Sequence, residues 1–326
     1  MPQLHRFILH PLTGRIFLCT LAGVYLVYLV GFVHALTTPQ TAPAVSVVEH
    51  AVETNPDIVV QHWSAASMRD AINADEQIGQ ASAPAQVSID TSAGKAAQQQ
   101  GQPAQDGSLS YPTSTVGKIF FTNSSGQNMA CSGTAVTSIN HNVVDTAGHC
   151  LYWQGGWVQN LIFCPLYENG TTPHGCWAAR DLEVPSDWID ARPGDLHHDF
   201  GMAIVAPNSQ GNLTDVVGGA GWAYNQPVKT PFYAYGYPAG YPFDGQTRKS
   251  CENATGSTWQ LFGGTVVSIP CNLTGGSSGG PWFIQINGDW YVNGHNDFTS
   301  SLRPGHMFSP YYDDTWYALY QKAQDS

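Results

Sequence analysis

Residues 275–281 read GGSSGGP, and residues 146–150 read TAGHC. These two stretches decide the fold and the chemistry that the sequence predicts. A serine set among glycines can act as a nucleophile, and the glycine backbone can present N–H groups to an oxyanion. A histidine can accept the proton of the serine hydroxyl and later return it. The pair therefore predicts nucleophilic acyl transfer, the chemistry of a serine hydrolase.

The composition of the 326-residue chain favours many short strands joined by polar turns. Only 11% of its residues are charged, whereas glycine and aromatic residues are plentiful. The formal net charge of −12 argues against a nucleic-acid partner, because no basic stripe exists to displace counterions from phosphates.

Seven cysteines indicate the compartment in which the chain folds. Cys19 lies in an apolar run near the N-terminus, and the other six lie between residues 131 and 271. An even number in this part fits three disulfides and an oxidising compartment. Six cysteines allow fifteen pairings, of which sequence order suggests Cys131–Cys150, Cys164–Cys176 and Cys251–Cys271. Zinc is the alternative, although no C-x-x-C pair is present.

The N-terminus favours export. Arg6 and Arg15 precede residues 16–33, which carry no charge. A run of this length is short for a membrane span and long for the core of a signal peptide. We therefore expect residues 1–36 to be either a cleaved signal peptide or a signal anchor, with the C-terminal part of the chain outside the cell.

Residues 37–110 differ in composition from the rest of the chain. Ala, Gln, Ser, Pro and acidic residues dominate, and such a segment cannot bury enough apolar surface to fold alone. We expect this region to be largely disordered and to be a propeptide, or alternatively a stalk. One short piece, around residues 63–78, could form a helix.

From residue 111 onward, short apolar runs alternate with turns. The clearest hairpin joins residues 282–286 to residues 289–292 through Asn287-Gly288, a pair that favours a type I′ turn. Residues 313–323 carry Trp316, Leu319 and Tyr320 on one helical face. Other predicted strands cover residues 116–121, 132–137, 142–146, 202–206, 231–235 and 264–269. The pattern predicts an all-β body with one C-terminal helix.

Three motifs together resemble a known family. They are residues 146–150, residues 198–205 (HDFGMAIV) and residues 275–281, in the order His, Asp, Ser. From residue 111 to its end the chain resembles the chymotrypsin-fold serine proteases, and it is most similar to the microbial branch that includes the glutamyl endopeptidases. The resemblance implies an all-β fold of two six-stranded antiparallel β-barrels, residues 111–228 and 229–326, and a disulfide between Cys131 and Cys150.

The resemblance also assigns the catalytic roles. It makes His149 the general base, Asp199 the group that orients the imidazole, and Ser278 the nucleophile. The backbone N–H groups of Gly276 and Ser278 would form the oxyanion hole.

Each assignment has a rival in the sequence. Ser277 lies beside Ser278, and Asp145, Asp190 and Asp195 compete with Asp199. Residues 197–199, read as a His-His-Asp cluster, could instead bind a metal ion, but no further ligand lies at a suitable spacing. Asp199 is favoured because it directly precedes an apolar strand, as the acid of the family does.

Two departures from the family concern activation and the substrate pocket. Animal relatives carry an aspartate where this chain has Ser277, so activation must proceed differently, through removal of the segment before residue 111. Asn272 takes the place of the aspartate that selects basic side chains. Thr274 and His295 are candidate pocket residues that would accept an acidic side chain, unless His295 is an ordinary strand residue.

The sequence therefore predicts an exported serine endopeptidase, made as a zymogen, that cleaves peptide bonds through an acyl-enzyme. It needs no cofactor or metal, acts on a peptide or protein substrate and binds no nucleic acid. It contacts a membrane only through its N-terminal segment and is a monomer, either secreted or anchored at the cell surface. The alternatives are a catalytically silent protease-fold binding module and an esterase, in which the histidine would have to follow the serine.

Overall fold

The structure of the chain is a computed structural model that describes residues 45–75, 111–190, 196–261 and 264–326. The predicted hydrophobic segment, residues 16–33, lies outside the described residues, as do residues 76–110 of the predicted propeptide. Among the helices that are described, none is both long enough and apolar enough to cross a membrane.

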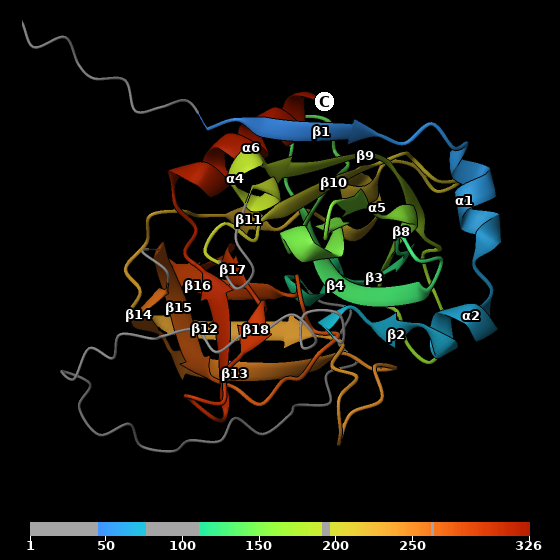
Figure 1. Cartoon of the computed structure of the whole chain (residues 1–326). Coiled ribbons are helices and arrows are strands. Elements are labelled where there is room, and N and C mark those ends of the chain that lie inside the picture. Colours follow the sequence, from blue (N-terminus) through green and yellow to red (C-terminus); the bar gives the residue numbers. More distant parts are fainter. Residues whose placement is uncertain (1–44, 76–110, 191–195, 262–263) are drawn as a thin grey trace, which may run out of the picture. The chain divides into compact units, whose positions relative to one another are not determined.

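A closed antiparallel barrel forms the first half of the fold (Figure 1). Six strands pair in a ring, and the pairing of the last strand, β8, with β9 closes it. In ring order the strands are β3 (Val116–Thr122), β4 (Asn128–Val136), β5 (Val143–Thr146), β10 (Gly201–Val205), β9 (Trp177–Pro185) and β8 (Gln159–Pro165). Inward-facing side chains such as Ile119, Phe163 and Leu182 fill the barrel.

The second half consists of two sheets around a shared core. The core includes Phe232, Ile269, Trp282 and Met307. One sheet contains β11 (Gly221–Trp222), β17 (Asp289–His295), β16 (Pro281–Ile286), β12 (Pro231–Gly236) and β13 (Lys249–Thr255); the other contains β14 (Ser257–Leu261), β15 (Gly264–Pro270), β19 (His306–Pro310) and β18 (Phe298–Thr299). The all-β class and the first six-stranded barrel are as the sequence predicts. The second predicted six-stranded barrel is instead, in the described residues, a five-stranded and a four-stranded sheet packed on one core.

The predicted hairpin and the predicted C-terminal helix are both present. β16 and β17 are joined by Asn287 and Gly288, whose φ values of 55° and 94° are the positive values that a type I′ turn requires. The helix α6 (Asp314–Asp325) is capped by Asp313, whose side chain accepts hydrogen bonds from the first turn. Its buried face includes Trp316, Leu319 and Tyr320 and packs in one cluster with β10.

Shorter elements lie before, between and just after the strands of the first barrel in the sequence. They are the 3₁₀ turns η1 (Thr113–Thr115) and η2 (Gly148–Cys150), the hairpin β6 (Tyr152–Trp153) and β7 (Gly156–Trp157), and the helices α4 (Ser186–Ile189) and α5 (Leu213–Val217). Three disulfides join Cys131 to Cys150, Cys164 to Cys176 and Cys251 to Cys271, the same pairs that sequence order suggests.

Residues 45–75, called here the N-terminal segment, form an ordered layer on the first barrel (Figure 1). The segment contains β1 (Val47–Ala51), α1 (Pro56–His62), α2 (Ala65–Asp70) and β2 (Ile72–Asn73). β1 extends the sheet by pairing antiparallel with β9, and β2 pairs parallel with β4. The expectation that residues 37–110 are largely disordered is therefore wrong for residues 45–62, whereas the helix expected around residues 63–78 is present as α2.

The physical reason is that the segment folds against a partner rather than alone. Val59, Trp63 and Met68 are buried with Phe120 and Tyr167 in one cluster. Phe120 lies on the opposite face of β3 from Ile119 and Phe121, and the segment covers it there. The sequence-based expectation considered only the apolar residues of the segment itself. It did not include the apolar surface around Phe120 against which they pack.

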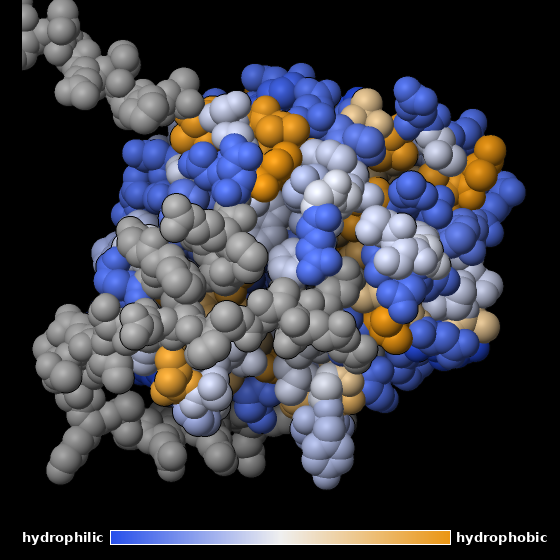
Figure 2. Space-filling view, viewed as in Figure 1, coloured by the Kyte–Doolittle hydropathy of each residue, from blue (hydrophilic) through white to orange (hydrophobic). Residues whose placement is uncertain are grey.

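On the face seen in Figure 2, the described residues are mainly hydrophilic, with apolar side chains scattered between them. Scattered apolar residues are normal for a soluble surface and do not mark a binding site.

Trp63→Ala should loosen the N-terminal segment. The Trp63 ring is 6% exposed, packs 5.5 Å from the ring of Phe120 and donates an Nε1 hydrogen bond of 2.7 Å to the Asn160 carbonyl. Truncating a buried tryptophan costs about 3–5 kcal/mol. Hydrogen exchange should therefore be faster at residues 56–70 in this variant.

The matched control is Ile58→Ala, in which the replaced side chain is 60% exposed and belongs to the neighbouring helix. This control should exchange like the wild type. Equal loss of protection throughout residues 111–326 would contradict the assignment of residues 45–75 to a separate layer.

Candidate active site

The ladder between β5 and β10 brings His149 and Asp199 together. β5 ends at Thr146, which pairs with Gly201, so the turn after β5 and the turn before β10 lie side by side. Nδ1 of His149 lies 2.8 Å from Oδ2 of Asp199, and the backbone N–H of His149 donates to Oδ1 at 2.7 Å. Both side chains are buried. The two contacts fix the imidazole in one orientation.

Of the rival acids, none that the structure describes approaches the histidine in this way. Asp145 accepts hydrogen bonds from the Tyr312 hydroxyl at 2.6 Å and from Nε1 of Trp316 at 2.9 Å, so it anchors the C-terminal helix. Asp190 is the C-cap residue of α4. Asp195 lies outside the described residues.

The charges around His149 oppose its burial. Burial lowers the pKa of His149. The charge and hydrogen bond of Asp199 and the charge of Asp75 together raise it by more, so the pKa lies above its ordinary value of 6.5. Burial raises the pKa of Asp199, yet the contacts with His149 and Asp297 outweigh this effect and lower it. The pair is therefore poised to carry a proton on the imidazole beside an ionised carboxylate.

Asp297 is a second buried carboxyl at this site, and the sequence analysis missed it. Its Oδ1 lies 3.7 Å from Nδ1 of His149. Burial and the charge of Asp199 raise the pKa of Asp297 well above its usual range. Within the described residues, neither of its carboxyl oxygens has a hydrogen-bond donor, as expected for a carboxyl that carries the proton itself. We therefore assign the neutral form to Asp297 and the charged form to Asp199.

Ser278 lies opposite the histidine, in the glycine-rich turn before β16. Its Oγ donates to Asp75 Oδ1 at 2.6 Å and lies 3.1 Å from the Asp297 carbonyl. Oγ of Ser277 instead donates to the Thr274 carbonyl, which turns it away from the site. Gly279, with a φ of +78°, lies so close to Ser132 and Thr146 that a Cβ atom would not fit.

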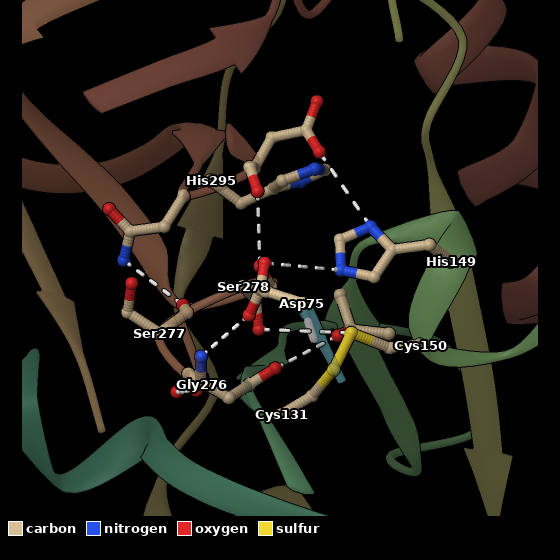
Figure 3. Close-up of a disulfide and its surroundings, with 12 residues drawn as sticks. Asp75, Cys131, His149, Cys150, Gly276, Ser277, Ser278 and His295 are labelled. Carbon is tan, nitrogen blue, oxygen red and sulfur yellow. Dashed lines mark hydrogen bonds and ion pairs between the residues drawn. A yellow bond between two sulfur atoms is a disulfide. The ribbon is translucent and has the colours of Figure 1, made fainter. Parts of the chain in front are cut away.

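The backbone of Gly276 completes the site from the same turn. Its N–H donates to Oδ2 of Asp75 at 2.6 Å. Asp75 thus reaches the serine, the Gly276 N–H and the neighbourhood of the histidine at once (Figure 3). Sequence reasoning missed Asp75, because residues 37–110 were expected to be a propeptide or stalk and no motif marks this aspartate as part of the site.

A pocket opens beside Ser278 and includes only one of the three predicted pocket residues. Thr274 lines it, Asn272 is exposed elsewhere, and His295 is fully buried. The pocket is lined by Asp75, Leu196, Thr274, Gly275, Ser277, Ser278, Asp297, Phe298, Thr299 and Met307.

His295 lies behind Asp199 instead of in the pocket. Its Nε2 lies 3.1 Å from the Asp199 carbonyl, and its Nδ1 lies 2.9 Å from the Tyr312 hydroxyl. Burial lowers its pKa to about 4, so it is neutral at physiological pH. Successive residues of a strand face opposite sides, so proximity in sequence does not settle which residue faces a pocket.

One set of described side chains also has the spacing of a metal site. Ligand atoms of His149, Asp199 and Asp297 lie within 4.8 Å of one another, and all three residues are buried. Two of these ligand atoms, Nδ1 of His149 and Oδ2 of Asp199, already lie at hydrogen-bond distance from each other. The neighbouring Cys131 and Cys150 are joined in a disulfide and offer no thiolate.

Comparison with known proteins gives serine proteases. No family model matches the sequence. The crystal structure of the protease Anisep from Arthrobacter nicotinovorans is 36% identical; the match covers 67% of this chain and 98% of that one, with a TM-score of 0.59. The thermostable serine protease AL20 from an extremophilic microorganism is also 36% identical, over 66% of this chain and 98% of the other, with a TM-score of 0.60.

Two further matches are more distant. A Glu endopeptidase structure is 17% identical with a TM-score of 0.54, covers 69% of this chain and 97% of its own, and supports the fold alone. An extracellular metalloprotease of Bacillus subtilis (strain 168) is 26% identical over 122 residues, which are 37% of this chain. That match spans only about a third (34%) of the Bacillus protein.

Asp297→Asn should leave the pKa of His149 unchanged, because the replacement removes a neutral group. Asp199→Asn should lower the pKa of His149, because it removes the charge that stabilises the imidazolium. NMR titration of the His149 ring in the full chain measures both effects. A lowered His149 pKa in Asp297→Asn would show that Asp297 is ionised.

Proposed function

The chain belongs to the serine proteases of the chymotrypsin-like fold, and from this premise we propose that it is an extracellular endopeptidase with His149, Asp199 and Ser278 as its catalytic triad. The observation that carries the proposal is the buried contact of 2.8 Å between Nδ1 of His149 and Oδ2 of Asp199, opposite Ser278. This contact leaves Nε2 of His149 facing the serine side of the site.

In the proposed reaction, Oγ of Ser278 attacks the carbonyl carbon of the substrate while its proton passes to Nε2 of His149. Asp199 stabilises the imidazolium, and the backbone N–H groups of Gly276 and Ser278 stabilise the oxyanion. The imidazolium then donates its proton to the leaving amine, which breaks the peptide bond and leaves an acyl-enzyme. Water, deprotonated by His149, releases the acid and restores the serine.

Two features support extracellular action. Three disulfides form in an oxidising compartment, and the apolar residues 16–33 would direct export. Peptides or proteins are the substrates of serine endopeptidases. We also propose that residues 37–110 are a propeptide, that residues 111–228 and 229–326 are the two halves of the mature enzyme, and that the chain is made as a zymogen.

The pocket supports a neutral substrate side chain better than an acidic one. The predicted preference for acidic residues depended on His295, which lies behind Asp199. The described pocket lining contains no Lys, Arg or His, and it offers Thr274, Phe298, Thr299 and Met307. Two acids also line the pocket. Asp297 is neutral and adds no charge that would recruit a basic side chain, and Asp75 belongs to the N-terminal segment and not to the two proposed halves of the mature enzyme.

A binding module without turnover is the second candidate, and the site argues against it. Such a module would tolerate the loss of the serine, the histidine or the acid. Here all three are present, and buried partners position the histidine and the acid.

Ser278→Ala should lower kcat/KM by at least about 1,000-fold, because the nucleophile is lost. Ser277→Ala is the matched control, since Oγ of Ser277 bonds only the Thr274 carbonyl and should be needed far less. A peptide library measures cleavage by both variants and by the wild type. Each is tested as the full chain, intact and after nicking at a site-specific protease sequence inserted within residues 76–110.

Equal cleavage by Ser278→Ala and the wild type, compared in the nicked chains after the N-terminal segment has been separated from them, would contradict the mechanism. The same library reports on the pocket, where neutral residues should be enriched before the cut. Enrichment of Glu or Asp at that position would contradict the neutral pocket.

A further inference from the structure

We propose that residues 45–75 inhibit the enzyme directly, with the Asp75 carboxylate bound in the oxyanion hole. The active-site face of the first barrel is then an interaction surface whose partner is the chain's own N-terminal segment. This inference rests on the proposed function, because inhibition needs a catalytic site to act on.

The Asp75 carboxylate occupies one of the two proposed oxyanion donors, the Gly276 N–H, and also binds the hydroxyl of the proposed nucleophile. Oδ2 accepts the Gly276 N–H at 2.6 Å, and Oδ1 accepts the Ser278 hydroxyl at 2.6 Å. The side chain is only 20% exposed. Donors that stabilise an oxyanion in a transition state also bind a carboxylate well, because both carry negative charge on oxygen.

The same contact breaks the link between nucleophile and base. The Ser278 hydroxyl donates to Asp75, not to His149 (Figure 3). Nε2 of His149 has no hydrogen-bond partner among the described residues, and its nearest acid is Oδ1 of Asp75 at 3.9 Å. Attack by the serine requires this nitrogen to take the hydroxyl proton. Asp75 therefore blocks both the oxyanion hole and proton transfer.

The segment contacts the site as an inhibitor rather than as a substrate. The group on Ser278 is a side-chain carboxylate, not a peptide carbonyl. A carboxylate shares its negative charge over two oxygens and resists nucleophilic attack. No peptide bond is therefore cleaved through this contact.

The chain leading to Asp75 is fixed in place on the barrel. β2 pairs with β4, and the Ala74 N–H donates to the Ala130 carbonyl at 3.0 Å. Gly275 makes room for it: a Cβ there would lie 2.9 Å from Oδ1 of Asn73 and 3.1 Å from Cβ of Asp75. The close approach of the segment thus depends on a residue without a side chain.

Anchors far from the site hold the segment on the protein. β1 pairs with five residues of β9, and Lys322 forms an ion pair of 2.7 Å with Glu49 beside them. Trp63 and Met68 are buried in the apolar cluster on β3. Such tethering keeps the Asp75 carboxylate at a high effective concentration beside Ser278. A cut within residues 76–110 alone would leave these anchors in place, so activation also needs the segment to leave.

Labelling of Ser278 by a fluorophosphonate, which reacts with activated serines, tests the proposal on the intact full chain. Asp75→Ala should be labelled at least about 10-fold faster than the wild type, whereas Asp70→Ala, an exposed acid of the same segment, should behave like the wild type. Ser278→Ala is the blank. Equal thermal unfolding of Asp75→Ala and the wild type shows that the fold is retained.

A second measurement uses the wild-type chain nicked within residues 76–110. Its labelling rate should rise on dilution as the segment dissociates, and added peptide 45–75 should slow labelling again. The same peptide with Asp75→Ala should inhibit at least about 10-fold more weakly.

The outcomes separate this inference from the proposed function. Rapid, equal labelling of the wild type and Asp75→Ala would overturn the inhibition and leave the protease assignment intact. Absence of labelling in every form, including the nicked and diluted chain, would overturn the proposed function and the inhibition with it.

Discussion

The buried contact between His149 and Asp199 is the interaction on which the rest of the site depends. An ionised carboxylate is costly to bury unless donors surround it. Here the backbone and ring of His149 supply two, and the neighbouring Asp297 also lowers the pKa of Asp199. Asp199 can therefore remain charged without solvent, and its charge keeps the imidazole basic enough to accept a proton.

Asp75 adds a further acid to this crowded site, where its ion-pair partner is Nε2 of His149 at 3.9 Å. Its charge is accepted by backbone and hydroxyl dipoles, from Gly276 and Ser278, while part of the carboxylate stays in contact with solvent. The charge of Asp75 also helps to raise the pKa of His149. The inhibited arrangement thus stabilises an imidazole proton and disfavours the neutral ring that a general base needs.

The sequence predicted what depends on local patterns. The glycine-rich turn pointed to Ser278, and the apolar strand that follows Asp199 pointed to that aspartate. Asn287-Gly288 indicated the hairpin that follows the serine. His295 was wrongly predicted to line the pocket and Asp297 was missed, because local sequence patterns do not tell which side chains meet in the folded protein. His295 faces away from the pocket because of its position in strand register, and Asp297 becomes visible only once the ladder places it beside Asp199.

The N-terminal segment was missed for a different reason, which also explains how inhibition can be both firm and reversible. Its apolar residues are too few to form a core, but they complete a cluster whose other half is the outer face of β3. A layer whose apolar side chains pack only against the barrel is less stable than the barrel itself, so it can dissociate without unfolding the enzyme. The Asp75 contacts are short, but a substrate carbonyl would compete for the Gly276 N–H, so these contacts alone would not exclude a substrate. Asp75 outcompetes the substrate because β1, α1 and α2 hold it beside the site. The strength of inhibition is therefore determined by apolar packing that lies far from the catalytic residues.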